Sequence, residues 1–275
     1  MLNLPPRSAF RAGHAFALAV AMATLERPAS ALDFGSALAK FMYDDAVATF
    51  HVRSYYFDRT NPRPPNNVAW ATGGWVGYET GWLYDTLQLG AVGYTTQPIW
   101  APPENSGSQL LKPGQYGFAV LGIAFASIRA KDQVFTGYRQ LIDEMEVNPD
   151  DGRMIPNTFE AYALRGELGK VTYFAGYVAA MKPRGSPVFV NMAERAGAPD
   201  VNAGMWLGSV KYGSSDHLRL RASGYHVPDI LTSGYADVVR TFHVAEKFDV
   251  RAAGNAMVQG SNGLNLLTDK PFSTW

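Results

Sequence analysis

Arginine and leucine alternate in the stretch SSDHLRLRASGYH, residues 214–226. In an extended chain successive side chains point to opposite faces, so Leu218 and Leu220 would share one face and Arg219 and Arg221 the other. A guanidinium group is permanently charged and offers a fork of donors that matches a carboxylate, so such a face can bind an anion. The pattern within this stretch does not decide whether that face meets bulk water or an enclosed aqueous space.

Residues for bond-making chemistry are sparse. The chain has no cysteine, which excludes disulfides, thiolate metal sites and cysteine nucleophiles. Its five histidines are scattered without the paired helical spacing of a zinc site, and no G-x-S-x-G turn is present. We therefore predict that the protein is not an enzyme, with no catalytic residue, no metal ligand and no cofactor.

The composition favours a folded, β-rich protein. Of the 275 residues, 47% are hydrophobic and 17% charged, which argues against disorder. The 27 glycines and the 13% aromatic content favour an all-β architecture with many turns. A net charge of zero gives no indication of a nucleic-acid partner.

The N-terminus is typical of an export signal. Arg7 and Arg11 supply the positive region, residues 15–23 form a short apolar core, and Ala29-Ser30-Ala31 is a small-residue cleavage site. An apolar run of this length is too short to cross a bilayer as a helix. We therefore predict a signal peptide at residues 1–31 and a mature protein at 32–275.

Beyond residue 45 the sequence divides into segments with period-two alternation, each ended by Gly, Pro, Asn or Asp. They are longer than the strands of average globular proteins and match the length of about nine to eleven residues that a tilted membrane strand needs. A twelfth strand is expected to begin near Phe272. The predicted strands are 46–58, 68–79, 86–97, 117–130, 132–143, 158–167, 170–181, 203–213, 216–226, 233–243 and 247–258.

The connections between these strands alternate between long and short along the chain from 61–67 onward, most weakly in the last cycle, 227–232 followed by 244–246. Short turns at one end and long loops at the other are typical of an up-and-down antiparallel transmembrane β-barrel. In such a barrel the apolar faces meet lipid and the polar faces line an aqueous lumen. The outward set would then include Leu218, Leu220, Ala222 and Gly224, and the inward set Arg219, Arg221 and Ser223.

Two features refine the barrel prediction. Aromatic residues gather at segment ends, among them Trp100, Phe174, Tyr225 and Phe248, as in the interfacial girdles of outer-membrane barrels. Residues 117–128 are apolar in both phases, which a strand covered by an inward-folded loop would tolerate.

Several motifs together resemble one family. They are VRSYYFDR, YETGWLYDTLQLGAVGYTTQPIWAP, LLKPGQYGF, YRQLIDEMEVNPDDGRMIPNTFEAYALRGELG and YFAGYVAAMKPR, the most specific being 148–160 and 181–184. In order and spacing they resemble the OprD family of substrate-specific outer-membrane porins, from about residue 45 to the C-terminus. The resemblance implies a barrel of about eighteen strands, monomeric or loosely trimeric, in which inward-folded loops narrow the pore and basic side chains guide a carboxylate. With eleven or twelve strands predicted, we expect a partial barrel at 32–275 and a fragment of a typical member.

The function that follows is passive, substrate-selective diffusion of small solutes across the bacterial outer membrane, with outer-membrane lipid as the surrounding partner. The solutes implied are carboxylate-bearing compounds or amino acids, guided by a basic stripe, while Asp150 and Asp151 of a loop could balance the stripe or bind an amine. Lys182 and Arg184 begin the next long loop. The cations predicted to form the stripe are Arg53, Arg139, Arg165, Arg219, Arg221 and Arg251.

Three alternatives remain open from the residues. Each arginine could pair with a neighbouring carboxylate and only stabilise the barrel wall. The protein could be an outer-membrane barrel enzyme that hydrolyses lipid, or a secreted carbohydrate-binding β-protein whose arginine faces meet water.

Overall fold

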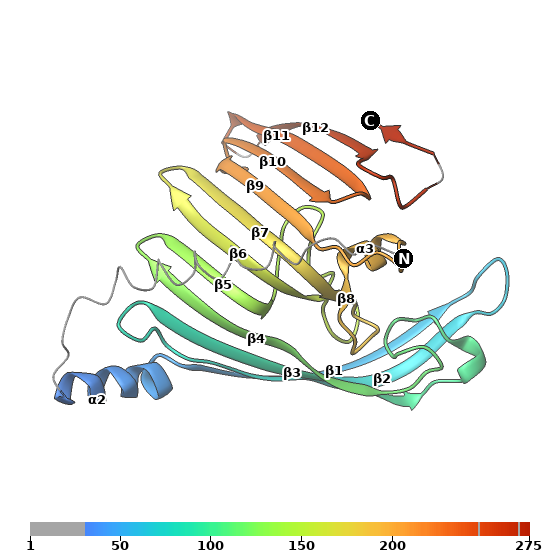
Figure 1. Cartoon of the computed structure of the whole chain (residues 1–275), viewed down its shortest axis with the longest axis horizontal. Helices are drawn as coiled ribbons and strands as arrows, with labels where there is room; N and C mark the ends of the chain where they lie inside the picture. The colour runs from blue at the N-terminus through green and yellow to red at the C-terminus, as the bar shows by residue number, and fades with distance from the viewer. Residues whose placement is uncertain (1–30, 247, 269) are drawn as a thin grey trace, which may run out of the picture.

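The computed structural model describes residues 31–246, 248–268 and 270–275 (Figure 1). The predicted signal peptide therefore lies outside the described residues except for Ala31. Within the described ranges, no helix is long and apolar enough to cross a membrane.

One antiparallel sheet dominates the structure, and it contains the eleven predicted strands at their predicted places. Each strand end differs from the prediction by at most three residues, and the twelfth strand is the two-residue β13. The long strands are β1 (Val47–Arg59), β2 (Asn67–Glu79), β3 (Leu87–Trp100), β4 (Phe118–Ala130), β5 (Gln133–Gln140), β6 (Thr158–Leu168), β7 (Val171–Lys182), β9 (Met205–Gly213), β10 (Leu218–Val227), β11 (Leu231–Ala245) and β12 (Phe248–Ser261), with β13 at Ser273–Thr274.

The sheet is a curved wall in which neighbours in sequence are neighbours in space (Figure 1). The order runs from β1 to β13, with the short β8 (Val190–Asn191) pairing beside β7. In the part of the chain that the structure describes, β1 and β13 do not pair, so the barrel is open between these two edges.

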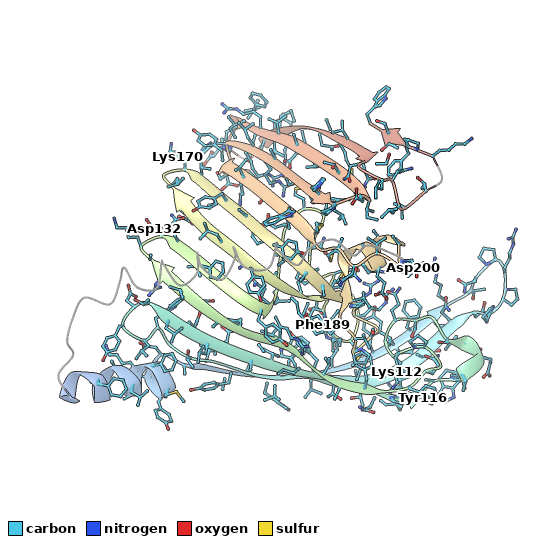
Figure 2. All side chains as sticks on the ribbon, in the orientation of Figure 1. Lys112, Tyr116, Asp132, Lys170, Phe189 and Asp200 are labelled. Carbon is cyan, nitrogen blue, oxygen red and sulfur yellow. The ribbon has the colours of Figure 1, made fainter. Side chains whose placement is uncertain are left out.

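The predicted sorting of connections is confirmed. Two-residue turns, 131–132 and 169–170, lie at one end, where Figure 2 labels Asp132 and Lys170. The loops 101–117, 141–157 and 183–204 lie at the other end; the first contains the 3-10 helix η2 (Pro103–Asn105), and the last contains β8 and α3 (Met192–Ala196). We call these the turn end and the loop end.

A helical segment, which lies before the first predicted strand, precedes β1 at the turn end. It consists of α2 (Ala31–Ala39) and the π-helical turn η1 (Lys40–Asp44). Phe41 of η1 is buried, and its carbonyl accepts a hydrogen bond of 2.8 Å from the Gly81 amide in the β2–β3 connection.

The predicted inversion of faces follows from the register. On β1, Phe50 is 81% exposed and pairs with the equally outward Val76, whereas the neighbouring His51 stacks on Trp75 inside, with ring centroids 3.9 Å apart. Leu220 is likewise exposed, while Ser223 of the same strand contacts an interior loop. Large apolar side chains on the outside with polar ones inside are the arrangement of a membrane barrel.

The buried core lies where the long loops fold onto the inner wall. Leu110, Met154 and Ile155 are fully buried in a cluster with wall residues, including Tyr94 and Ile123. This cover by the loops accounts for the apolar residues at 117–128, which include most of β4. A register shift between Val92 and Gly93 opposite β4 leaves Leu121 half-exposed and Ile123 buried, so the strand needs apolar residues in both phases.

A second cluster joins the inward loops to the other half of the wall. Ile142 and Val147 of loop 141–157 pack with Met192 and Ala193 of α3 and with wall residues such as Leu207. Asn191 caps α3, because its side chain accepts a hydrogen bond from the Glu194 amide at 2.9 Å. The two clusters fix the loops as part of the folded interior.

The aromatic residues predicted to form girdles divide between the two faces of the sheet. Trp100 and Phe248 lie at strand ends and are more than half exposed. Phe174 is buried, and the Tyr225 hydroxyl accepts a hydrogen bond from the inward-facing Gln259, so these two belong to the interior. Position at a segment end does not determine on which face of the sheet a side chain lies, because successive residues at a strand end point to opposite faces.

Candidate functional site: the charged lumen

The tip of loop 141–157, with the sequence NPDDGR, is held against β1. Nη1 and Nη2 of Arg53 donate to the two carboxylate oxygens of Asp151 at 2.8 and 3.2 Å, and Arg53 also donates to the Arg153 carbonyl. Its guanidinium lies 5.1 Å from the centre of the Trp75 ring. The two predicted site residues Arg53 and Asp151 thus meet as a forked ion pair across 98 positions of sequence.

Asp150, the neighbour of Asp151 in sequence, is held by a different segment, loop 183–204. Arg184, at the start of loop 183–204, forms an ion pair with Asp150 at 2.7 Å and donates from Nε to Gln109 at 2.7 Å. Asp150 has a φ of +42°, which the tight turn at the loop tip requires. One loop tip therefore connects β1, loop 101–117 and loop 183–204.

Lys182 lies beneath this junction and is fully buried. Its Nζ donates to the carbonyls of Pro156 and Pro183 at 2.8 and 3.3 Å and lies 5.9 Å from the Tyr94 ring. No carboxylate pairs with it among the described residues. Lys182 therefore fixes the end of loop 141–157, and its amine is not open to a passing solute.

Arg139 projects toward loop 183–204. It pairs with Glu160 of the neighbouring strand at 3.0 Å, and its guanidinium lies 4.2 Å from the Phe189 ring. Figure 2 shows Phe189 on the concave side of the sheet. Tyr138, with φ of +79°, breaks the alternation just before Arg139, which is why Tyr138 is exposed and Arg139 is inside.

The arginines of the LRLR stretch share one partner. Arg219 and Arg221 contact the two carboxylate oxygens of Asp237 at 3.1 and 2.6 Å. Asp237 is buried on β11 directly opposite Arg221 in the register. Two cations and one anion leave this group with a net positive charge.

Loop 141–157 also contacts the wall through two glutamates. Glu144 accepts a hydrogen bond from Ser209 at 2.6 Å, and Glu146 accepts one from Ser223 at 2.9 Å. Ser209 and Ser223 are paired neighbours on β9 and β10, so the loop lies across these strands. The second carboxylate oxygen of Glu146 is buried without a hydrogen-bond partner among the described residues.

A cavity of about 730 Å³ lies between this loop and the wall. Arg165 donates to the Gln140 side chain and the Leu141 carbonyl, both at 3.0 Å, and therefore has only neutral hydrogen-bond acceptors. Across the cavity, the loop presents Asp143 and Glu144. The charged residues that line the cavity are Arg165, Lys211 and Arg221, together with Asp132, Asp143, Glu144 and Glu167.

The structure thus brings nine of the ten predicted residues into the lumen region occupied by the loops, though in separate groups. Arg251 is the exception, because it lies on β12 near the open edge and is exposed.

Sequence reasoning missed the partners Asp237 and Glu160, the lining residue Lys211 and the ring of Trp75. For Lys211 a signal was available, since it shares the phase of Leu207 and Ser209 on one strand. Among the described residues, no group of three or more His, Asp or Glu side chains could hold a metal ion.

Comparison with known proteins places this geometry in context. A family model described as "outer membrane porin, OprD family" matches residues 39–269. The fold is similar to that of a BenF-like porin from Pseudomonas fluorescens Pf-5, with a TM-score of 0.74 and 18% identity over 84% of this chain and 62% of that one. Comparison with curated proteins gave no match.

Two further porin structures have the same fold. OpdK from Pseudomonas aeruginosa, solved with vanillate, has a TM-score of 0.71 and 21% identity over 84% of this chain and 61% of that one. OccAB1 from Acinetobacter baumannii has a TM-score of 0.69 and 18% identity over 81% of this chain and 54% of that one. This chain therefore spans roughly six tenths of the length of these solved structures.

Proposed function

Because the chain belongs to the OprD family of outer-membrane porins, we propose that it contributes the charged lumen of a channel for passive, substrate-selective diffusion of small solutes. The solutes are carboxylate-bearing compounds or amino acids. The proposal assigns no catalytic residue to the chain, since its family and its structural neighbours are porins. Assembly as a monomer or a loose trimer belongs to the same proposal.

The observation that carries this proposal is the opposition of charges across the cavity. Arg165, Lys211 and Arg221 are on the wall, with Asp132 and Glu167 toward its turn end, and Asp143 and Glu144 are on the loop that faces it. A guanidinium that has only neutral acceptors, such as that of Arg165, retains its full charge for a passing carboxylate. The loop carboxylates would at the same time suit an amine on the same solute.

The other arginines have different roles in the proposed channel. Arg53 and Arg184 are already paired with the loop aspartates, so they hold the tip of loop 141–157 in place and contribute little free charge. Arg219 and Arg221 share one carboxylate and so keep a net positive charge on the stripe. OpdK was solved with vanillate, a compound that carries a carboxylate, which accords with the proposed solute class.

The test is the reversal potential of the channel in a planar bilayer under a KCl gradient. We expect anion preference, reduced in Arg165→Gln because this change removes a cation that forms no ion pair with a carboxylate among the described residues. Arg63→Gln is the matched control, since Arg63 is exposed in the β1–β2 loop and the same charge is lost outside the lumen. Cation preference in the unaltered protein, or equal shifts in the two variants, would contradict the basic stripe.

A further inference from the structure

The outward face of β9–β12 is largely apolar and has one charged residue. Arg240 lies on β11, where the buried Val239 and Asp237 face inward and the exposed Val238 and Phe242 face outward. Its position between Val238 and Phe242 therefore puts Arg240 on the side that meets lipid. Among the described residues of β9–β12, it is the one Lys, Arg, Asp or Glu on that face.

The surroundings of Arg240 offer no counter-charge. Its cross-strand partners are Leu218 and Ala252, and Leu220 and Val250 lie diagonally beyond them on the same face. In the part of the chain that the structure describes, the Arg240 side chain has no hydrogen bond and no ion pair; its one specific contact is the Phe242 ring, 5.6 Å from the guanidinium carbon. An unpaired charge in hydrocarbon is costly, so the guanidinium needs a partner from outside the chain.

The direction of the side chain indicates where that partner lies. Phe242 is the next outward residue toward the turn end, so the guanidinium leans toward that end of the barrel. Arg240 is five residues from Ala245, where β11 ends, and five residues of a strand tilted by about 40° rise roughly 13 Å along the membrane normal. The short turns of outer-membrane barrels lie on the periplasmic side, and the long arginine side chain shortens that distance further, so the guanidinium reaches toward the headgroups of the periplasmic leaflet.

We propose that Arg240 binds the phosphate group of a phospholipid in the periplasmic leaflet. The planar fork of guanidinium matches a phosphate, and the exposed apolar residues around it, Val238, Phe242 and Val250, would receive the acyl chains of the same molecule. This site continues the lipid-facing surface of the barrel and is separate from the lumen. The inference rests on membership of an outer-membrane family and is independent of the solute proposed above.

Native mass spectrometry of the full chain in detergent, titrated with phosphatidylglycerol, tests the site. We expect Arg240→Gln to weaken the tightest lipid-binding event by about fivefold, the factor for one basic side chain near an anionic headgroup. Arg63→Gln, which removes an exposed arginine at the loop end, should leave that event unchanged. Equal lipid retention in Arg240→Gln and the unaltered protein would overturn the proposal.

Two further measurements keep the test decisive. The unaltered protein titrated with dioleoylglycerol, which has the acyl chains and no phosphate, should show no tight binding event. Equal binding of phosphatidylglycerol and dioleoylglycerol would contradict binding through the phosphate. The same spectra report subunit number. If Arg240→Gln changes the oligomer and leaves lipid retention as it was, the partner is another protein chain and the proposal is wrong.

Discussion

At the scale of single residues, the charges of the lumen wall come as groups with shared partners. Asp237 is the clearest case, because one buried carboxylate holds two arginines that alternate on β10. Such a carboxylate has two effects. It positions both guanidinium groups, and it cancels one of their two charges before any solute arrives.

We predict that Asp237→Asn makes the channel more selective for anions. The amide keeps the shape of the carboxylate and one acceptor, but both arginines then carry uncompensated charge. The free energy of unfolding should fall by roughly 1–3 kcal/mol, because a buried charge-assisted interaction is lost.

The reversal potential measures the change in selectivity of Asp237→Asn, and urea unfolding in lipid measures its change in stability. Asp200→Asn, in the exposed part of loop 183–204 (Figure 2), is the control and should change neither.

A second prediction concerns the loop tip. Arg53 and Asp151 should show a favourable coupling in a double-mutant cycle with Arg53→Gln and Asp151→Asn. Both side chains are partly exposed, so we expect a coupling of about 0.5–1 kcal/mol in stability. The single variants should also increase the low-frequency current noise of the open channel, because the tip then loses its contact with β1. Additive stability effects and unaltered noise would show that the pair plays no part in holding the loop.

The same residues show how far sequence reasoning reaches. Alternation is a local property, so it correctly placed Arg219 and Arg221 on the face of Ser223. The identity of their partner depends on the register of β10 against β11, which puts Arg221 opposite Asp237; that register is set by the geometry of the connection 228–230, which the alternation within β10 does not specify. Arg53 and Asp151 lie still further apart in sequence, and the three-dimensional path of an irregular loop is not encoded by any periodicity.

At the scale of elements, the loops form the only extensive apolar packing in the described part of the chain. The wall contributes inward apolar residues such as Ile123 and Leu207, and loops 101–117 and 141–157 cover them with the buried Leu110, Met154 and Ile155 or with Ile142. The sequence predicted this cover for β4 from its two apolar phases. It could not predict which loops provide the cover, because the apolar residues of a loop carry no periodic signal.

We predict that Leu110→Ala loosens the constriction. Leu110 is fully buried, and its carbonyl accepts a hydrogen bond from Thr96 at 2.8 Å. Truncation of a buried leucine costs roughly 2–5 kcal/mol through lost burial and the remaining cavity. We expect faster proteolysis within loops 101–117 and 141–157 of the folded protein, while the strands stay protected. Leu264→Ala, at a side chain that is 75% exposed, should leave the cleavage rate unchanged. Equal rates in the two variants would contradict a packed loop layer.

At the scale of the whole molecule, the direction of the strands restricts how the wall can close. The eleven long strands alternate in direction, so β1 and β12 both run from the turn end to the loop end. Direct pairing of these two strands would be parallel, whereas every pair in the sheet is antiparallel. Closure therefore needs an odd number of further strands between them, and β13 occupies the first of these positions. The barrel of about eighteen strands that the sequence motifs imply meets this parity condition.

The inversion of faces gives the last prediction, which the two alanines Ala253 and Ala256 of β12 test directly. They point to opposite sides, because Gln259, in the phase of Ala253, donates to Tyr225 inside. An arginine in place of Ala256 would enter hydrocarbon and should destabilise the folded protein by about 2–4 kcal/mol near the bilayer midplane. The same arginine in place of Ala253 would reach the aqueous lumen, where its charge stays hydrated, so the loss should be much smaller. Urea unfolding in lipid vesicles measures both. A larger loss for Ala253→Arg than for Ala256→Arg would mean that the apolar side of this sheet faces inward.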